Sequence, residues 1–161
     1  MKIIALIPFW IDYKPFKKSL ACRSLVEVSG KSLINRTIEI TNHVKLIDKT
    51  VIFTSGSEVF SHIDDNMNYE IVQRSSDLDS DKTSIEDIIN EFLQISDADI
   101  VVLIHPKSPF IRPQTIGECI EKVLAGGFDS AFIANSIKRQ AWYKGKPLNY
   151  LIDKDTPMLS E

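Results

Sequence analysis

The chain has 161 residues, of which 43% are hydrophobic and 25% are charged, a composition typical of one globular domain with a real core. Its formal net charge of −3 at pH 7 argues against a general nucleic-acid binder or a membrane-surface protein. The cysteines, Cys22 and Cys119, have neither metal-site nor redox spacing, so we expect a reduced, cytoplasmic protein.

The first predicted element is a strand over residues 2–8, because the amino-terminal apolar run ends at Pro8 and is too short to span a bilayer. A long loop then leads to Gly30, with no other glycine in it. Loops that join a strand to a helix usually take about 2–6 residues, and longer ones tend to be functional or disordered. This loop also carries four cations: Lys14, Lys17, Lys18 and Arg23.

Further β-rich runs follow over residues 50–54, 69–74, 98–104 and 130–134. They are nearly continuous in apolar residues, as expected of strands that are buried on both faces of a mainly parallel sheet.

Helical patterns alternate with these strands. One begins at Leu33, a second has Thr83 and Glu86 spaced as a capping box, and a third begins near Pro113 and stops at Gly126. The alternation predicts a single α/β domain over residues 1–161, a three-layer sandwich with a Rossmann-like, mainly parallel sheet and right-handed crossovers.

Polar segments follow four of the predicted strands, over residues 8–14, 54–58, 74–81 and 105–112. Open α/β sheets bind ligands at the carboxyl ends of their strands. Strand ends are also polar simply because they meet water. The recurrence of cations favours an anion site over that alternative; they are Lys14, Arg23, Arg74, Lys107 and Arg112.

Four stretches resemble the acylneuraminate cytidylyltransferases, a family within the sugar nucleotidyltransferases: "VSGKSLINRTIE", "TSGSE", "RSSDLDSDKTSIEDII" and "VVLIHPKSPFIRP". The resemblance covers nearly the whole chain. It implies the fold of the nucleotide-diphospho-sugar transferases and the coupling of CTP to a nine-carbon or similar nonulosonic (sialic-like) sugar acid. It also implies release of pyrophosphate, Mg²⁺ as cofactor and a possible homodimer.

The resemblance, together with the positions of the cations, also implies a set of site residues. Lys14 and Arg23 would be catalytic, neutralising the triphosphate. The expected nucleotide-binding residues are Lys14, Arg23, Ser24, Arg74 and Ser84, and the expected sugar-binding residues are His105, Ser108 and Arg112. The metal ligands are left unassigned, because Asp153 and Asp155 are read as ordinary loop aspartates.

Each of these assignments has a structural alternative. Lys14 and Arg23 would fit a solvated basic loop, and Arg74 would fit a surface salt bridge to Asp77 or Asp81. Trp10 and Tyr13 would either stack on a base or sugar or fill space in the loop.

The chain departs from the family at several positions. Trp10-Ile11-Asp12-Tyr13 replaces Arg-Gly-Gly-Ser, whose glycines let a backbone wrap phosphates. His105 replaces Gln, Lys107 replaces Thr, and Gly56 replaces Asp. We also expect the chain to lack the family's carboxyl-terminal dimerisation and metal-binding portion.

Two further functional hypotheses therefore stand beside the cytidylyltransferase. One is a non-catalytic or diverged nucleotide- or sugar-binding relative with a rebuilt phosphate loop. The other is a transferase for a different activated sugar acid or sugar phosphate, with the rebuilt loop recognising that substrate. The glycine-free loop favours these two, whereas the family-like segments favour an enzyme.

Overall fold

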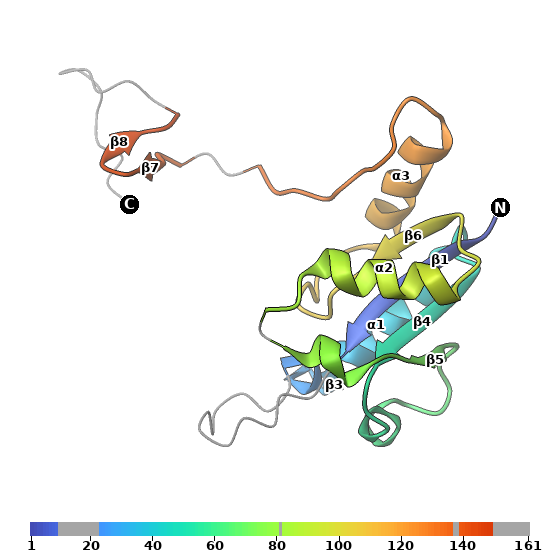
Figure 1. Ribbon diagram of the computed structural model, residues 1–161. Coiled ribbons are helices and arrows are strands. Elements are labelled where there is room, and N and C mark those ends of the chain that lie inside the picture. The colour runs from blue at the N-terminus through green and yellow to red at the C-terminus, as the bar shows by residue number, and fades with distance from the viewer. Residues whose placement is uncertain (10–22, 81, 137–138, 150–161) are drawn as a thin grey trace.

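The computed structural model describes residues 1–9, 23–80, 82–136 and 139–149. Its centre is a four-stranded parallel sheet in the order β5-β4-β1-β6 (Figure 1). Ala5 of the central strand lies opposite Thr50 on one side and Val102 on the other, so β1 has a hydrogen-bonded partner on both edges. The strands are β1 (Ile3–Phe9), β4 (Lys49–Thr54), β5 (Glu70–Gln73) and β6 (Ile100–Leu103).

Helices cover both faces of this sheet. They are α1 (Leu33–Asn42), α2 (Ile85–Ile95) and α3 (Pro113–Leu124). In Figure 1, α2 lies in front of the sheet and α1 lies behind it. None of the helices in the described part of the chain has the length and apolar character needed to cross a membrane.

Successive side chains of β1 point to opposite faces of the sheet, so they pack alternately against the helices on the two faces. Ile7 and Phe9 pack with Ile34 and Ile38 of α1, and Ala5 packs with residues of α3. Leu6 points to the other face, where it joins the cluster that contains Phe92 of α2. Every residue of β1 is buried, which accounts for its unbroken apolar sequence. The predicted three-layer α/β sandwich is confirmed.

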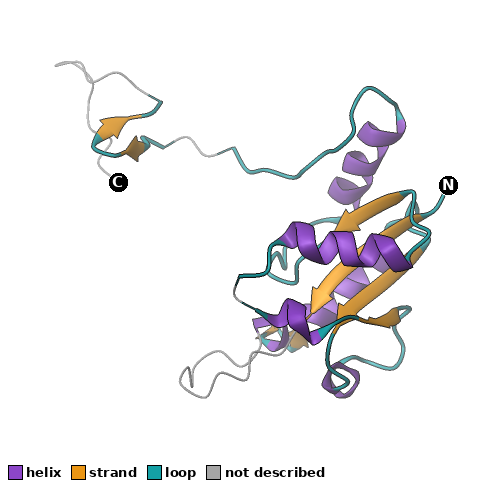
Figure 2. Ribbon diagram, in the orientation of Figure 1, coloured by secondary structure: helices purple, strands orange, loops and turns teal. Residues whose placement is uncertain are grey.

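Two short hairpins and several 3-10 helices lie outside the main sheet and its helices (Figure 2). A hairpin precedes α1, formed by β2 (Glu27–Val28) and β3 (Lys31–Ser32), and a second is formed by β7 (Trp142–Tyr143) and β8 (Lys146–Pro147). The 3-10 helices are η1 (Arg23–Leu25), η2 (Glu58–His62) and η3 (Ser76–Asp79). The first hairpin turns through Ser29 and Gly30, with φ angles of 53° and 74°, a conformation that favours glycine.

Two sequence-based expectations were wrong. The predicted strand over residues 130–134 has no regular secondary structure, and its residues Phe132 and Ile133 are exposed. A β-prone run becomes a strand only when a neighbouring backbone accepts its hydrogen bonds, and here the outer edge of β6 pairs with no strand in the described ranges. The capping box at the start of α2 is formed by Ser84 and Asp87, one residue later than predicted.

Candidate functional site

The four strands of the sheet end on the same side, because all of them run parallel. The polar segments that follow β4, β5 and β6 therefore gather along one edge of the domain, which we call the carboxyl edge. β1 also ends at this edge, at Phe9. Adjacent strands lie about 4.8 Å apart, so the outermost strands, β5 and β6, are separated by about 14 Å.

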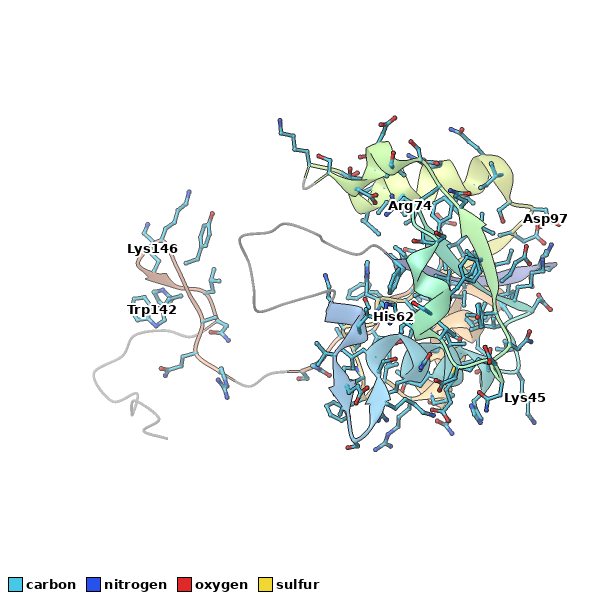
Figure 3. All side chains as sticks on the ribbon, turned by 90° about the horizontal axis from the view of Figure 1, so that it is seen from below. Lys45, His62, Arg74, Asp97, Trp142 and Lys146 are labelled. Carbon is cyan, nitrogen blue, oxygen red and sulfur yellow. The ribbon has the colours of Figure 1, made fainter. Side chains whose placement is uncertain are left out.

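Arg74 follows β5 directly, and its side chain has no exposed surface. Its Nη2 donates to Oδ1 of Asp79 at 2.6 Å, and its Nη1 donates to the Ser75 carbonyl oxygen at 3.2 Å. The other carboxylate oxygen of Asp79 accepts from Oγ of Ser55, at the end of β4, at 2.5 Å. Figure 3 places Arg74 on the α2 side of the sheet. The network joins the ends of β4 and β5 to η3.

The partner of Arg74 was missed at the sequence level. The structural alternative named Asp77 and Asp81, whereas the ion pair is formed with Asp79. The five-residue separation of Arg74 and Asp79 was the only available signal, and it gains meaning only because η3 turns the chain back toward β5.

Ser84 is the N-cap residue of α2. Its Oγ accepts from the backbone N–H of Asp87 at 3.1 Å, and the Asp87 carboxylate accepts from the Ser84 backbone at 3.0 Å. The bond from the Ser84 backbone, together with one that Ser84 Oγ donates to the same carboxylate at 2.8 Å, lowers the pKa of the Asp87 carboxyl. The side chain of Ser84 is exposed, so it remains reachable by a ligand while it caps the helix.

The three residues expected to bind the sugar acid, His105, Ser108 and Arg112, line a single open groove at the other end of the carboxyl edge. The groove has a volume of about 1170 Å³ and runs between β6, α3 and residues 129–135. Lys107 lines it as well. The lining holds two cations, Lys107 and Arg112, and two acidic residues, Asp99 and Asp129. Both cations follow β6, whereas Asp99 precedes it, so the part of the groove after β6 can receive a carboxylate.

His105 is half-buried in this groove. Burial lowers the pKa of its imidazole below the ordinary value, and the nearby charge of Lys107 lowers the pKa further. The ring is therefore neutral at pH 7 and can both donate and accept a hydrogen bond.

The end of the long first loop is tied to α1. Arg23 begins η1 and Ser24, which follows it, is half-buried. The Leu33 backbone N–H donates to the Val26 carbonyl oxygen at 2.9 Å, and the β2–β3 hairpin lies between them. Lys14, Trp10 and Tyr13 lie outside the described residues, as do Asp153 and Asp155.

A second, smaller cavity of about 290 Å³ was not anticipated from the sequence. It lies between the β2–β3 hairpin, the start of α1 and the end of η2, and its lining is mostly polar. The buried Asn35 side chain donates to the Asp64 carboxylate at 2.9 Å and accepts from the Asp64 backbone at 3.3 Å. This pair fixes the segment after η2 against α1. The Ser29-Gly30 turn was the available sequence signal for the hairpin.

The structure thus gathers the expected residues in two places. Arg74 and Ser84 lie near the end of β5 and the start of α2, whereas His105, Ser108 and Arg112 line the groove beside β6. Within the described ranges, no three His, Cys, Asp or Glu side chains gather as a metal-binding group.

Comparisons with known proteins bear on the family and the fold of the chain. A sequence model described as cytidylyltransferase matches residues 20–159. The N-acylneuraminate cytidylyltransferase of Streptococcus agalactiae serotype V is 26% identical over 141 residues, which are 86% of this chain and 33% of that protein. The serotype III protein gives the same identity and coverage. The chain thus spans about one third of the length of the curated relatives it matches.

Solved structures share the fold. A CMP-2-keto-3-deoxy-manno-octonic acid synthetase in complex with CTP has a TM-score of 0.62 and 18% identity, covering 78% of this chain and 48% of that one. A 4-diphosphocytidyl-2C-methyl-D-erythritol synthase has a TM-score of 0.59 and 13% identity, covering 91% and 66%. A Mycobacterium tuberculosis protein in complex with manganese has a TM-score of 0.53 and 15% identity, covering 78% and 61%. At such identities the likeness shows the fold alone, and it confirms the predicted nucleotide-diphospho-sugar transferase type.

Proposed function

The chain belongs to the cytidylyltransferase family, and on that premise we propose that it couples CTP to a nonulosonic, sialic-like sugar acid and releases pyrophosphate. The observation that carries the proposal is the family match over residues 20–159, which includes the polar segments after β4, β5 and β6. The Streptococcus agalactiae relatives support the choice of sugar acid.

In the proposed reaction, the anomeric hydroxyl oxygen of the sugar acid forms a bond to the α-phosphorus of CTP. The bond from that phosphorus to the oxygen bridging to the β-phosphate breaks, pyrophosphate leaves, and the hydroxyl proton passes to solvent. Such a transfer is accelerated mainly by holding the two reactants in line and neutralising charge on the phosphates.

The carboxyl edge offers a place for each reactant. We assign the nucleotide to the β1–β5 side, where Arg74 and Ser84 would contact the base and where Arg23 and Ser24 would meet the phosphates. Lys14, on the same loop as Arg23, would share the catalytic task of neutralising the triphosphate. We assign the sugar acid to the groove beside β6, with Arg112 and Ser108 on its carboxylate and neutral His105 on a hydroxyl.

A divalent cation is part of the proposal, with Mg²⁺ as the expected ion. Mg²⁺ binds through substrate phosphates together with one or two carboxylates, and it would neutralise phosphate charge. The manganese-bound relative in fold supports a divalent cation. The described residues offer no group of three or more metal-ligating side chains, so we assign no protein ligand.

We also propose a homodimer, located in the cytoplasm, as the functional form. Exposed apolar side chains beside the groove, Phe132 and Ile133, support self-association.

The direct test is calorimetric titration with CTP, UTP, ATP and GTP, each in the presence of Mg²⁺. We expect CTP to bind most tightly, and we expect its affinity to fall when the metal is removed with a chelator. Lys14→Ala should weaken CTP binding by about tenfold, which corresponds to about 1.4 kcal/mol, with Lys17→Ala as the matched control on the same loop.

A second assay separates an enzyme from a binding protein. Pyrophosphate release is followed with CTP and a sialic acid, and a neutral sugar of similar size serves as control. Release that requires the sugar acid supports the proposed transferase. Tight CTP binding without release supports the non-catalytic relative, and equal affinities for the four nucleotides reject the cytidylyl assignment.

A further inference from the structure

The ion pair between Arg74 and Asp79 joins a fully enclosed cation to a solvent-facing anion. The Arg74 side chain is 0% exposed, whereas that of Asp79 is 35% exposed. The carboxylate is therefore the member of the pair that meets water. A ligand at the carboxyl edge can reach Arg74 only after groups that enclose it move aside, and Asp79 is the partly exposed one among its hydrogen-bond partners that carries charge.

The guanidinium also has unused hydrogen-bonding capacity. Its Nε is buried and has no hydrogen-bond partner in the described part of the chain. Most buried donors in folded proteins are paired, so an unpaired one requires an explanation. A ligand that supplied acceptor atoms to Arg74 would satisfy a donor that the protein leaves unsatisfied.

The segment that bears Asp79 is lightly attached. The 3-10 helix η3 has four residues, and none of them is buried. Ser55 donates to the Asp79 carboxylate at 2.5 Å, and the Ser75 backbone just before η3 donates to Glu91 at 2.9 Å. A displacement of Asp79 therefore exposes little apolar surface and breaks few hydrogen bonds.

We propose that Asp79 determines nucleotide affinity by occupying the guanidinium of Arg74 in the free protein, and that the pyrimidine base displaces it on binding. This inference rests on the proposed function, and it concerns a residue to which the family resemblance assigns no role. Cytosine presents its O2 and N3 as adjacent acceptors, which match the parallel N–H donors of a guanidinium. The released Asp79 carboxylate returns to water.

The exchange has a quantitative consequence. A ligand that binds only the open form has its apparent affinity reduced by the fraction of molecules that are open. If one molecule in ten is open, weakening the Arg74–Asp79 pair tightens CTP binding about tenfold. A carboxylate that merely held Arg74 in position for the ligand would have the opposite effect when it is removed.

The test compares Asp79→Asn, which keeps the shape of the side chain and removes its charge, with Asp77→Asn on the same 3-10 helix. CTP affinity is measured by calorimetry. Accessibility of Arg74 is measured separately, by modification with phenylglyoxal and peptide mass spectrometry, with exposed Arg139 as the internal reference. We expect Asp79→Asn to bind CTP about tenfold more tightly and to react faster at Arg74, and we expect Asp77→Asn to match the parent protein.

A second variant keeps the inference testable if Asp79→Asn does not fold. Ser55→Ala keeps the charge of Asp79 and removes only its hydrogen bond, so a smaller gain in both readouts is expected. Weaker or unchanged CTP binding in Asp79→Asn, with Arg74 still unreactive, would overturn the inference. The ion pair would then only stabilise the folded structure. If the parent protein binds no nucleotide, the proposed function fails. The labelling experiment then decides by itself whether Asp79 closes access to Arg74.

Discussion

His105 lines the groove at the end of β6, where burial and the charge of Lys107 both disfavour its protonated form. Its pKa in the folded chain is lowered, whereas in the unfolded chain it returns to about 6.5. Between these two pKa values the unfolded state binds more protons than the folded state. His105 therefore lowers the free energy of unfolding as the pH falls through about 6.5, and this loss levels off below the pKa of the folded state.

This pH dependence can be isolated by substitution. We expect the melting temperature of the parent protein to fall more between pH 7.5 and pH 5.5 than that of His105→Gln, because glutamine does not titrate. The two proteins differ in no other titratable group, so the difference between their losses reports His105 alone. Circular dichroism melting curves at both pH values give the comparison. Identical losses would show that His105 is protonated freely in the folded protein.

The sequence alone could not identify a residue's partner where that partner depends on how the chain folds back on itself. Asp79 lies among several acidic residues in "RSSDLDSD", and only the position of η3 relative to β5 selects it as the partner of Arg74. By contrast, the grouping of His105, Ser108 and Arg112 followed from one short segment after one strand, so local sequence was sufficient.

At the scale of elements, apolar periodicity predicted each α-helix and each strand of the parallel sheet, because these patterns record which face is buried. The same patterns do not fix the residue at which a helix begins. Thr83 with Glu86 and Ser84 with Asp87 both have capping-box spacing, and the sequence alone gives no reason to choose between them. The structure chooses Ser84, so α2 begins at Ile85.

Ser84 and Thr83 provide a matched test of where α2 begins. Ser84→Ala should lower the free energy of unfolding by about 1 kcal/mol, because it removes the side-chain acceptor of the helix cap. Thr83→Ala should change it much less. Urea denaturation followed by circular dichroism measures both. An equal loss in the two variants would show that the cap is shared, and a larger loss in Thr83→Ala would contradict the observed helix start.

The segment over residues 130–134 shows where local pattern fails. Its composition favours a strand, yet strand formation depends on a partner backbone that no local pattern contains. The segment flanks the groove beside β6 without pairing with the sheet.

At the scale of the whole molecule, residues 130–134 leave apolar side chains exposed to solvent, because they do not pair with the sheet. Phe132 is 85% exposed and Ile133 is 43% exposed. We expect the chain to self-associate through this segment, because exposed apolar patches next to a groove commonly mark interfaces. Sedimentation velocity over a range of concentrations should show a dimer that the double variant Phe132→Ser, Ile133→Ser weakens about tenfold or more. Leu93→Ser, on the exposed face of α2, is the control.

A monomer at every concentration would contradict this expectation. The outer edge of β6 would then require cover from the chain itself, and the same double variant would lower stability instead of association.

The position of β1 between β4 and β6 also has a consequence during synthesis. The ribosome completes β4 about 50 residues before it completes β6. At roughly 5–20 residues per second, translation takes about 2.5–10 s to cover that distance. Throughout this interval β1 can pair along one edge only, although all seven of its residues are buried in the finished protein. The nascent chain is then most exposed to aggregation through that edge, and it is in those seconds that binding by a chaperone would matter most.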